Sequence, residues 1–198
     1  EFTGGTAVKY DASKLFAASA HQALARGLEI GRRFHSAPVV RLSDVRQMQL
    51  GHVAEADARW RIYAFAGKAD SSNPGSAIHN LADWLEHDPK SPVVRHTRKG
   101  EDVDAVIDFR AVFQQTFDQL AYEDMPSLLK PRTGKLGLQD HEKIFCVDHK
   151  GVGDIFDLRG IDRDAGCMVV VRPDQYTAHV LPLDGFDELS AFFAGILR

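Results

Sequence analysis

The sequence predicts an α/β fold, and three observations lead to it. Residues 60–66 (WRIYAFA) combine β-branched and aromatic residues in an alternating pattern, which indicates a strand. Residues 77–86 carry apolar side chains at helical spacing. Near the C-terminus, two apolar runs at 167–172 and 176–181 enclose Pro173-Asp174, a pair that favours a tight turn. A strand, a helix and a β-hairpin are therefore expected in this order.

The first part of the domain reads as a β-α-β unit. The strand 60–66 is followed by a loop at 67–76 (GKADSSNPGS), rich in glycine, serine and proline, and then by the helix 77–86. Residues 103–109 (VDAVIDF) form the next predicted strand. Two strands joined by a crossover helix are expected to lie parallel.

The second part of the domain begins with an irregular segment, which is followed by predicted strands and a helix. Residues 122–139 contain several prolines and glycines and are expected to form an irregular excursion. A short strand is predicted at 143–148, and an amphipathic helix at 186–197 closes the chain after the hairpin. The order β-α-β and then β-β-α is that of a thioredoxin-like domain.

The N-terminal region is predicted to be an extension of this domain. Residues 1–11 are rich in glycine and threonine and are expected to be extended. A helix is predicted at 13–27, with Ser13 as its N-cap and Gly27 as its stop. The chain starts at Glu1 and shows no signal-peptide pattern, so its start is interpreted as a cut.

Composition narrows the functional classes. The chain has 198 residues, of which 44% are hydrophobic and 26% charged, as in an ordinary globular protein. A net charge of -4 argues against non-specific binding of nucleic acid, which needs a basic face. No apolar run is long enough to predict a membrane span, so no membrane partner is expected.

The cysteines argue against dithiol chemistry. A redox thioredoxin needs C-x-x-C at the start of the helix that follows the first strand, but residues 67–74 contain no cysteine. Cys146 and Cys167 lie in apolar runs and are expected to be buried and unpaired, which favours a reducing cytoplasm. Two rival functions stay open: a stand-alone redox or peroxide-handling enzyme with a low-pKa thiolate, and a small-molecule binding module.

No catalytic, cofactor-binding or metal-ligating residue is predicted. The nine histidines are scattered, and Cys146-x-x-His149 has no second ligand pair around it. Gly151-x-Gly153 lacks a third glycine and is expected to be a turn before a strand. There is no G-x-S-x-G motif.

Three arginines, Arg41, Arg159 and Arg172, stand in apolar stretches. A buried guanidinium is usually paired with a carboxylate, because an unpaired buried charge is unfavourable. The predicted partners are Asp154, Asp157, Asp162 and Asp174. An anionic ligand bound by these arginines is the alternative interpretation.

Several motifs, in order along the chain, resemble the phenol hydroxylase family of class A FAD monooxygenases. They cover nearly the whole sequence: FTGG at 2–5 with Tyr10, GRRFHSAPVVR at 31–41, WRIYAF at 60–65, RAVFQQ at 110–115, LQD at 138–140, DIFD at 154–157, and VVVRPD at 169–174 with Tyr176. The chain is similar to the C-terminal domain of these enzymes. Related polyketide hydroxylases have glycine after VRPD, where this chain has Gln175, and we expect a turn without positive φ there.

The resemblance implies a thioredoxin-like domain without redox cysteines at 31–198, preceded at 1–30 by an extension from a substrate domain. It implies a parent enzyme that uses FAD and NADPH to hydroxylate a phenol or hydroxybenzoate. In this family the flavin and substrate groups belong to the N-terminal domains, so this chain is expected to be inactive alone. It would form a homodimer and cover those domains.

Aromatic and arginine side chains near the two strongest motifs are the predicted contact groups, because such residues are favoured at interface hot spots. They are Phe34, His35, Arg41, Arg172 and Tyr176. Burial of these residues within one copy of the chain is the alternative.

Overall fold

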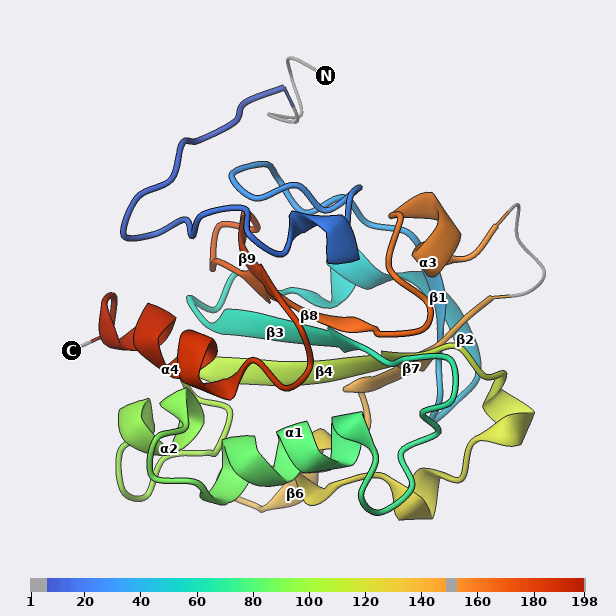
Figure 1. Cartoon of the computed structure of the whole chain (residues 1–198). Coiled ribbons are helices and arrows are strands. Elements are labelled where there is room, and N and C mark those ends of the chain that lie inside the picture. The colour runs from blue at the N-terminus through green and yellow to red at the C-terminus, as the bar shows by residue number, and fades with distance from the viewer. Residues whose placement is uncertain (1–6, 149–152, 198) are drawn as a thin grey trace.

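The computed structural model describes residues 7–148 and 153–197, and its centre is a seven-stranded mixed sheet in the order β2-β1-β7-β4-β3-β8-β9 (Figure 1). The strands of this sheet are β1 (Pro38–Arg41), β2 (Arg46–Gln49), β3 (Trp60–Phe65), β4 (Ile107–Phe113), β7 (Ile144–Cys146), β8 (Cys167–Val171) and β9 (Thr177–Leu181). A separate two-stranded ribbon consists of β5 (Arg132–Thr133) and β6 (Leu138–Gln139). The α-helices are α1 (Ala77–His87), α2 (Pro92–His96), α3 (Ile155–Leu158) and α4 (Phe186–Ala194). Short 3-10 turns are η1 (Gln22–Leu24), η2 (Leu50–Val53), η3 (Phe117–Gln119), η4 (Tyr122–Asp124) and η5 (Ser127–Leu129).

The predicted β-α-β unit is confirmed. β3 and β4 are parallel, with Ile62 opposite Phe109, and α1 connects them. β8 runs antiparallel to β3 and also to β9, which confirms the hairpin. The succession β3-α1-β4, then β8-β9-α4, is the thioredoxin-like order that the sequence predicts.

The helices α1, α2 and α4 lie against one face of the sheet (Figure 1). The helix α1 begins at Ala77 because the Ser76 side chain accepts a hydrogen bond from the backbone of His79. Its residues Ile78, Leu81 and Leu85 are fully buried on the side that faces the sheet. The apolar sides of amphipathic helices thus cover this face of the sheet.

The opposite face is covered by the N-terminal segment and α3 (Figure 1). The same segment also protects the edge of the sheet at β9. Backbone hydrogen bonds join Gly31 N to Thr177 O, Thr177 N to Arg32 O, and Phe34 N to Gln175 O, at 2.7–2.9 Å. These bonds satisfy backbone groups that an edge strand would otherwise expose.

The helix predicted at 13–27 is wrong, because the described residues there form only the 3-10 turn η1. The side chain of Gln22 bonds to Ala25 O and Leu28 O and accepts from Ile30 N, which fixes a non-helical path. Ala17 N bonds to Ala178 O on β9. Tertiary contacts with the sheet therefore override local helix propensity.

The strand predicted at 103–109 is shifted. β4 begins at Ile107 and continues to Phe113, past the charged Arg110. Both Asp108 and Arg110 are buried, and Arg110 Nε lies 2.8 Å from Asp108 Oδ2. Mutual pairing thus allows charged residues inside a fully buried strand.

Other differences are local. The strands β1 and β2 were not predicted, since each has only four residues. After Gly153 the chain enters the helix α3, not a strand, because Asp154 caps its first turn. Residues 149–152 lie outside the described part of the chain, and so do the predictions made for His149 and Gly151. Gln175 has φ of +68°, so the expectation of a turn without positive φ is wrong.

Candidate interaction surface

Two of the predicted contact residues, Arg172 and Tyr176, come together at the β8–β9 turn. The Tyr176 ring meets the Tyr10 ring edge-on at 5.1 Å, and Tyr10 stacks on Phe16 at 5.3 Å. The Arg172 guanidinium lies 4.7 Å from the centroid of the Phe16 ring. We call these four residues the aromatic patch.

The aromatic patch is partly open to solvent. Tyr10 is 49% exposed, whereas Phe16 is buried beneath it. Arg172 is held by Asp174, with nitrogen–oxygen distances of 3.0 and 2.8 Å, as the sequence predicts for this pair. Rigid aromatic groups beside an anchored arginine are the composition found at interface hot spots.

Sequence reasoning did not select Tyr10 or Phe16 as contact residues. The two residues reach Tyr176 only because the N-terminal segment folds back over the hairpin. Phe16 was expected within the helix predicted at 13–27. No spacing within the segment could have revealed a contact across so much of the chain.

The backbone of Phe34 adjoins the β8–β9 turn through its bond to Gln175 O, but its side chain packs in the interior and is not part of the aromatic patch. Phe34 is 8% exposed and stacks on Tyr63 at 4.9 Å. His35 is half-buried, and its Nε2 has no hydrogen-bond partner in the described part of the chain. Burial, and then the charges of Arg159 and Arg32, lower the pKa of His35, which favours its neutral form.

Arg41 is fully engaged within the domain. Its guanidinium binds Asp44 through two nitrogens, at 2.9 and 2.6 Å, and also pairs with Glu142. The hydrogen bonds to Asp44 raise the pKa of Arg41, which burial alone would lower. The aspartates proposed for it from the sequence are not its partners, because β1 lies beside β7 and turns tightly into β2.

The expectation for Arg159 is also wrong. Its Nη2 donates to Ser36 O at 2.6 Å and its Nη1 to Leu158 O at 3.3 Å, so it binds backbone carbonyls. Asp154 and Asp157 instead pair with Arg163. Burial lowers the pKa of Arg159.

The position of the redox motif in a thioredoxin is occupied here by a carboxylate. Asp70 is 8% exposed, and its two oxygens accept hydrogen bonds from Ser72 N and Ile78 N, both at 2.8 Å. A thiolate would use the same positive end of the helix α1 for its own stabilisation. Asp70 therefore takes the place that a reactive cysteine would need.

The two cysteines are inert by geometry. Cys146 in β7 and Cys167 in β8 have no exposed surface, and β4 and β3 lie between their strands. Strands about 4.8 Å apart place them roughly 14 Å from each other, too far for a disulfide. Burial raises the pKa of Cys146 to about 12 and raises that of Cys167 as well. The redox rival therefore has no thiolate to use in the described part of the chain.

The first turns of the two longest described helices, α1 and α4, do not suit a flavin dinucleotide. A dinucleotide pyrophosphate binds at a helix N-terminus that offers free backbone N–H groups. At α1 these groups face Asp70, and the first turn of α4 carries Asp187 and Glu188. These carboxylates would repel a pyrophosphate. Among the described helices, none is long and apolar enough to cross a membrane.

Comparison with solved structures agrees with the observed topology. The structure superposes on a thioredoxin-like protein from Bacteroides caccae with a TM-score of 0.53 and 10% sequence identity. The match covers 89% of this chain and 53% of the other. The fold is therefore thioredoxin-like.

Curated proteins with similar sequences include two monooxygenases. The chain is 51% identical to 3-hydroxybenzoate 4-monooxygenase from Comamonas testosteroni, over all of this chain and 31% of that protein. It is 31% identical to an FAD-dependent monooxygenase from Aspergillus terreus, over all of this chain and 33% of that protein. The chain thus spans about a third of the length of these relatives.

The family comparison covers almost the entire chain. Residues 8–198 match the family described as phenol hydroxylase, C-terminal dimerisation domain. The match includes both sheet faces, the aromatic patch and the occupied helix terminus described above. The chain belongs to the C-terminal dimerisation domain family of the phenol hydroxylases.

Proposed function

We propose that this chain is the dimerisation and cover domain of an FAD- and NADPH-dependent aromatic hydroxylase. It would carry no catalytic group of its own. Support comes from the family and from relatives named as monooxygenases, one of them FAD-dependent. The flavin would be held, and the ring hydroxylated, by other domains of a longer protein, because the cofactor itself supplies that chemistry.

The observation that carries this proposal is the aromatic patch. A surface ring such as Tyr10, 49% exposed and stacked on a buried ring, offers rigid apolar area at little conformational cost. The patch includes residues of the N-terminal extension, 1–30, which we propose connects to a preceding substrate domain. Contact between the patch and that domain would cover the substrate side.

Self-association is the second part of the proposed role, and the partner would be another copy of the same chain. A reducing cytoplasm as the location fits two buried, unpaired thiols. Phe34, His35 and Arg41 remain proposed contact residues of lower accessibility. Arg172 and Tyr176 are the better candidates because they lie at the surface of the patch.

The test is size-exclusion chromatography of the purified chain with light scattering and an absorption spectrum across each peak. We expect a colourless species with twice the 21.9 kDa mass of one copy. A monomer at micromolar concentration would contradict the dimerisation role. A yellow peak would contradict the absence of a flavin site.

A further inference from the structure

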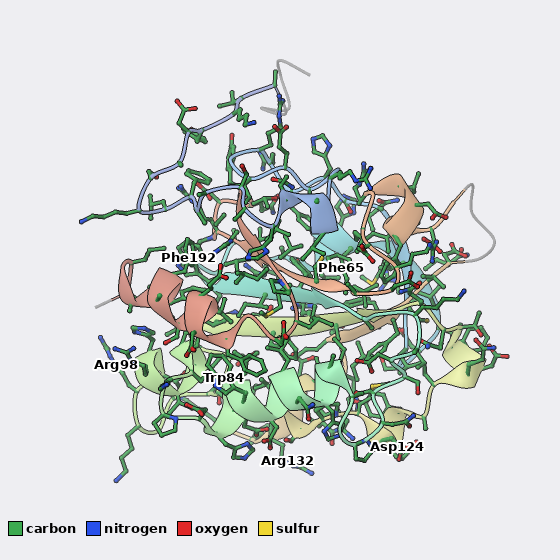
Figure 2. The ribbon with its side chains drawn as sticks, in the orientation of Figure 1. Phe65, Trp84, Arg98, Asp124, Arg132 and Phe192 are labelled. Atoms are coloured by element: carbon green, nitrogen blue, oxygen red, sulfur yellow. The ribbon has the colours of Figure 1, made fainter. Side chains whose placement is uncertain are left out.

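The β5–β6 ribbon presents two leucines to solvent. Leu136 is 83% exposed and Leu138 is 66% exposed, more than any other large apolar side chain in the described part of the chain. Arg132, at the start of the ribbon, lies at the lower margin of the molecule, beyond α1 (Figure 2). Two exposed leucines on one short ribbon offer apolar area that a partner could cover.

Hydrogen bonds hold the ribbon in one shape. Asp140 N bonds to Pro131 O at its base, at 2.8 Å, and Gly137 N bonds to Gly134 O across its turn, at 3.0 Å. Gly134 N is also tied to Asp102 Oδ2 at 2.9 Å. The turn positions Gly134 and Gly137 have φ of +70° and +58°, which glycine adopts readily. An ordered turn reduces the entropy lost when Leu136 is bound.

The ribbon is also basic. Between Asp124 and Asp140 the sequence has no acidic residue but contains Lys130, Arg132 and Lys135. Lys130 is used internally, since its Nζ donates to Glu123 O at 2.7 Å. Arg132 donates to Gly137 O, and no described carboxylate lies within ion-pair distance of Arg132 or Lys135. A complementary site would be apolar, with acidic groups at its rim.

One cavity of the molecule has this chemistry. It has a volume of about 410 Å³. Its lining is made by apolar residues and three polar ones: Val40, Val45, Phe117, Val147, Gln47, Thr116 and Asp148. Phe117 and Val45 are 46% and 45% exposed, so its apolar wall is open to a partner. Asp148 supplies a carboxylate to the lining, and one of its oxygens accepts a hydrogen bond from Gln47 Nε2 at 2.9 Å.

The ribbon and the cavity lie on different sides of one copy. The ribbon lies below α1, whereas β1 and β2, which carry Val40 and Gln47 of the cavity lining, lie at the right of the sheet (Figure 1). Leu136 therefore contacts nothing in its own cavity, as its exposure also shows. In a twofold dimer, each copy would contribute one ribbon and one cavity, which gives a closed pair.

We propose that two copies of this chain dimerise by reciprocal insertion of Leu136 into this cavity, with Lys135 facing the Asp148 side. The inference rests on the dimerisation role proposed above and names the contact that performs it. A preorganised apolar tip enters an apolar site, and opposite charges select the orientation. The partner is a second copy because the apolar Leu136 tip matches an apolar cavity, and the basic ribbon matches an acidic residue in the lining of that cavity.

The experiment compares Leu136→Glu with the matched control Leu158→Glu, a leucine in α3 that is 43% exposed. Dimer dissociation constants are measured by light scattering over a dilution series, and circular dichroism checks that each variant is folded. We expect Leu136→Glu to weaken the dimer by about 30-fold or more, as for a hot-spot residue, and the control to leave it unchanged.

A cross-linking test locates the partner site directly. Chains carrying Leu136→Cys are mixed with chains carrying Phe117→Cys under oxidised glutathione. A covalent dimer is expected from the mixture, but not when Leu158→Cys replaces Leu136→Cys. The native thiols do not compete because both are buried.

The outcomes separate the two proposals. If the unmodified chain is a monomer at all concentrations, the dimerisation role itself fails. If it is a dimer that Leu136→Glu leaves intact, and no cross-link forms, the role stands and the insertion of Leu136 is refuted.

Discussion

The ammonium group of Lys143 lies 2.7 Å from the carboxylate of Asp108, and at most 1% of either side chain is exposed. Lys143 also contacts Asp104 at 2.7 Å, while Asp108 binds Arg110 at 2.8 Å. These groups form a network of ion pairs on the face of the sheet that the N-terminal segment covers. Each charge depends on its neighbours, because burial without a partner is strongly unfavourable.

Removing one member of this network should destabilise the fold. We expect Lys143→Met to lower the free energy of unfolding by about 3–5 kcal/mol, because it removes the cation shared by two buried carboxylates, Asp104 and Asp108. The measurement is urea denaturation at neutral pH. Lys90→Met is the control, since Lys90 and Asp187 are 73% and 91% exposed and 3.8 Å apart. Such surface pairs contribute at most about 1 kcal/mol, and equal losses in both variants would argue against a cooperative network.

The same network predicts acid sensitivity. Burial would raise the pKa of Asp108, but the charges and hydrogen bonds of Arg110 and Lys143 outweigh burial and lower it to about 2. A carboxyl group with a depressed pKa in the folded state stabilises the fold above its unfolded value, near 3.9. That contribution disappears as the pH falls toward 2. We expect a loss of roughly 2–3 kcal/mol between pH 5 and pH 2 from this group, measured by denaturation at each pH. A stability that is constant over this range would contradict the assignment.

The two thiols should not react with thiol reagents in the native protein. Neither Cys146 nor Cys167 is exposed, and burial raises the pKa of both. We expect an aromatic disulfide reagent at pH 8 to modify neither cysteine within minutes, and to modify both once urea unfolds the chain. Rapid reaction of either thiol in native buffer would revive the redox interpretation.

Gln175 offers a position where the chain can be stabilised. Its φ of +68° is unfavourable for a residue with a Cβ atom. We expect Gln175→Gly to increase the free energy of unfolding by about 0.5–1 kcal/mol, after allowance for the greater freedom of glycine in the unfolded chain. The comparison is Gln49→Gly at φ of -91°, where glycine should destabilise. A loss of stability at both positions would show that the Gln175 side chain matters more than its backbone strain.

Sequence reasoning predicted the parts of the fold that depend on local pattern. The strand at Trp60, the helix α1 with its leucines and the β8–β9 hairpin all have periodicities that short windows reveal. It missed the elements whose conformation depends on distant partners. Residues near Phe16 have helical spacing but bind the edge of β9, and Arg110 is charged but continues a buried strand through its pair with Asp108.

The candidate site was predictable to a similar degree. Arg172 with Asp174 is a contact between near neighbours, so the sequence showed both members. Tyr10 and Leu136 were not selected, because their significance lies in exposure, which single-sequence patterns do not report. Phe34 was selected for its type, yet its stacking on Tyr63 places it inside the domain.

The cover that residues 31–34 provide along β9 has a consequence for how the molecule can assemble. The sheet is sealed at β9 and ends at β2 on its other side, where no described strand pairs with its outer edge. If copies of the domain paired only through this one open sheet edge, two copies would use up both open edges and a third copy could not be added. Among the described residues, strand-to-strand pairing of copies through the sheet is therefore open at β2 and blocked along β9 by residues 31–34.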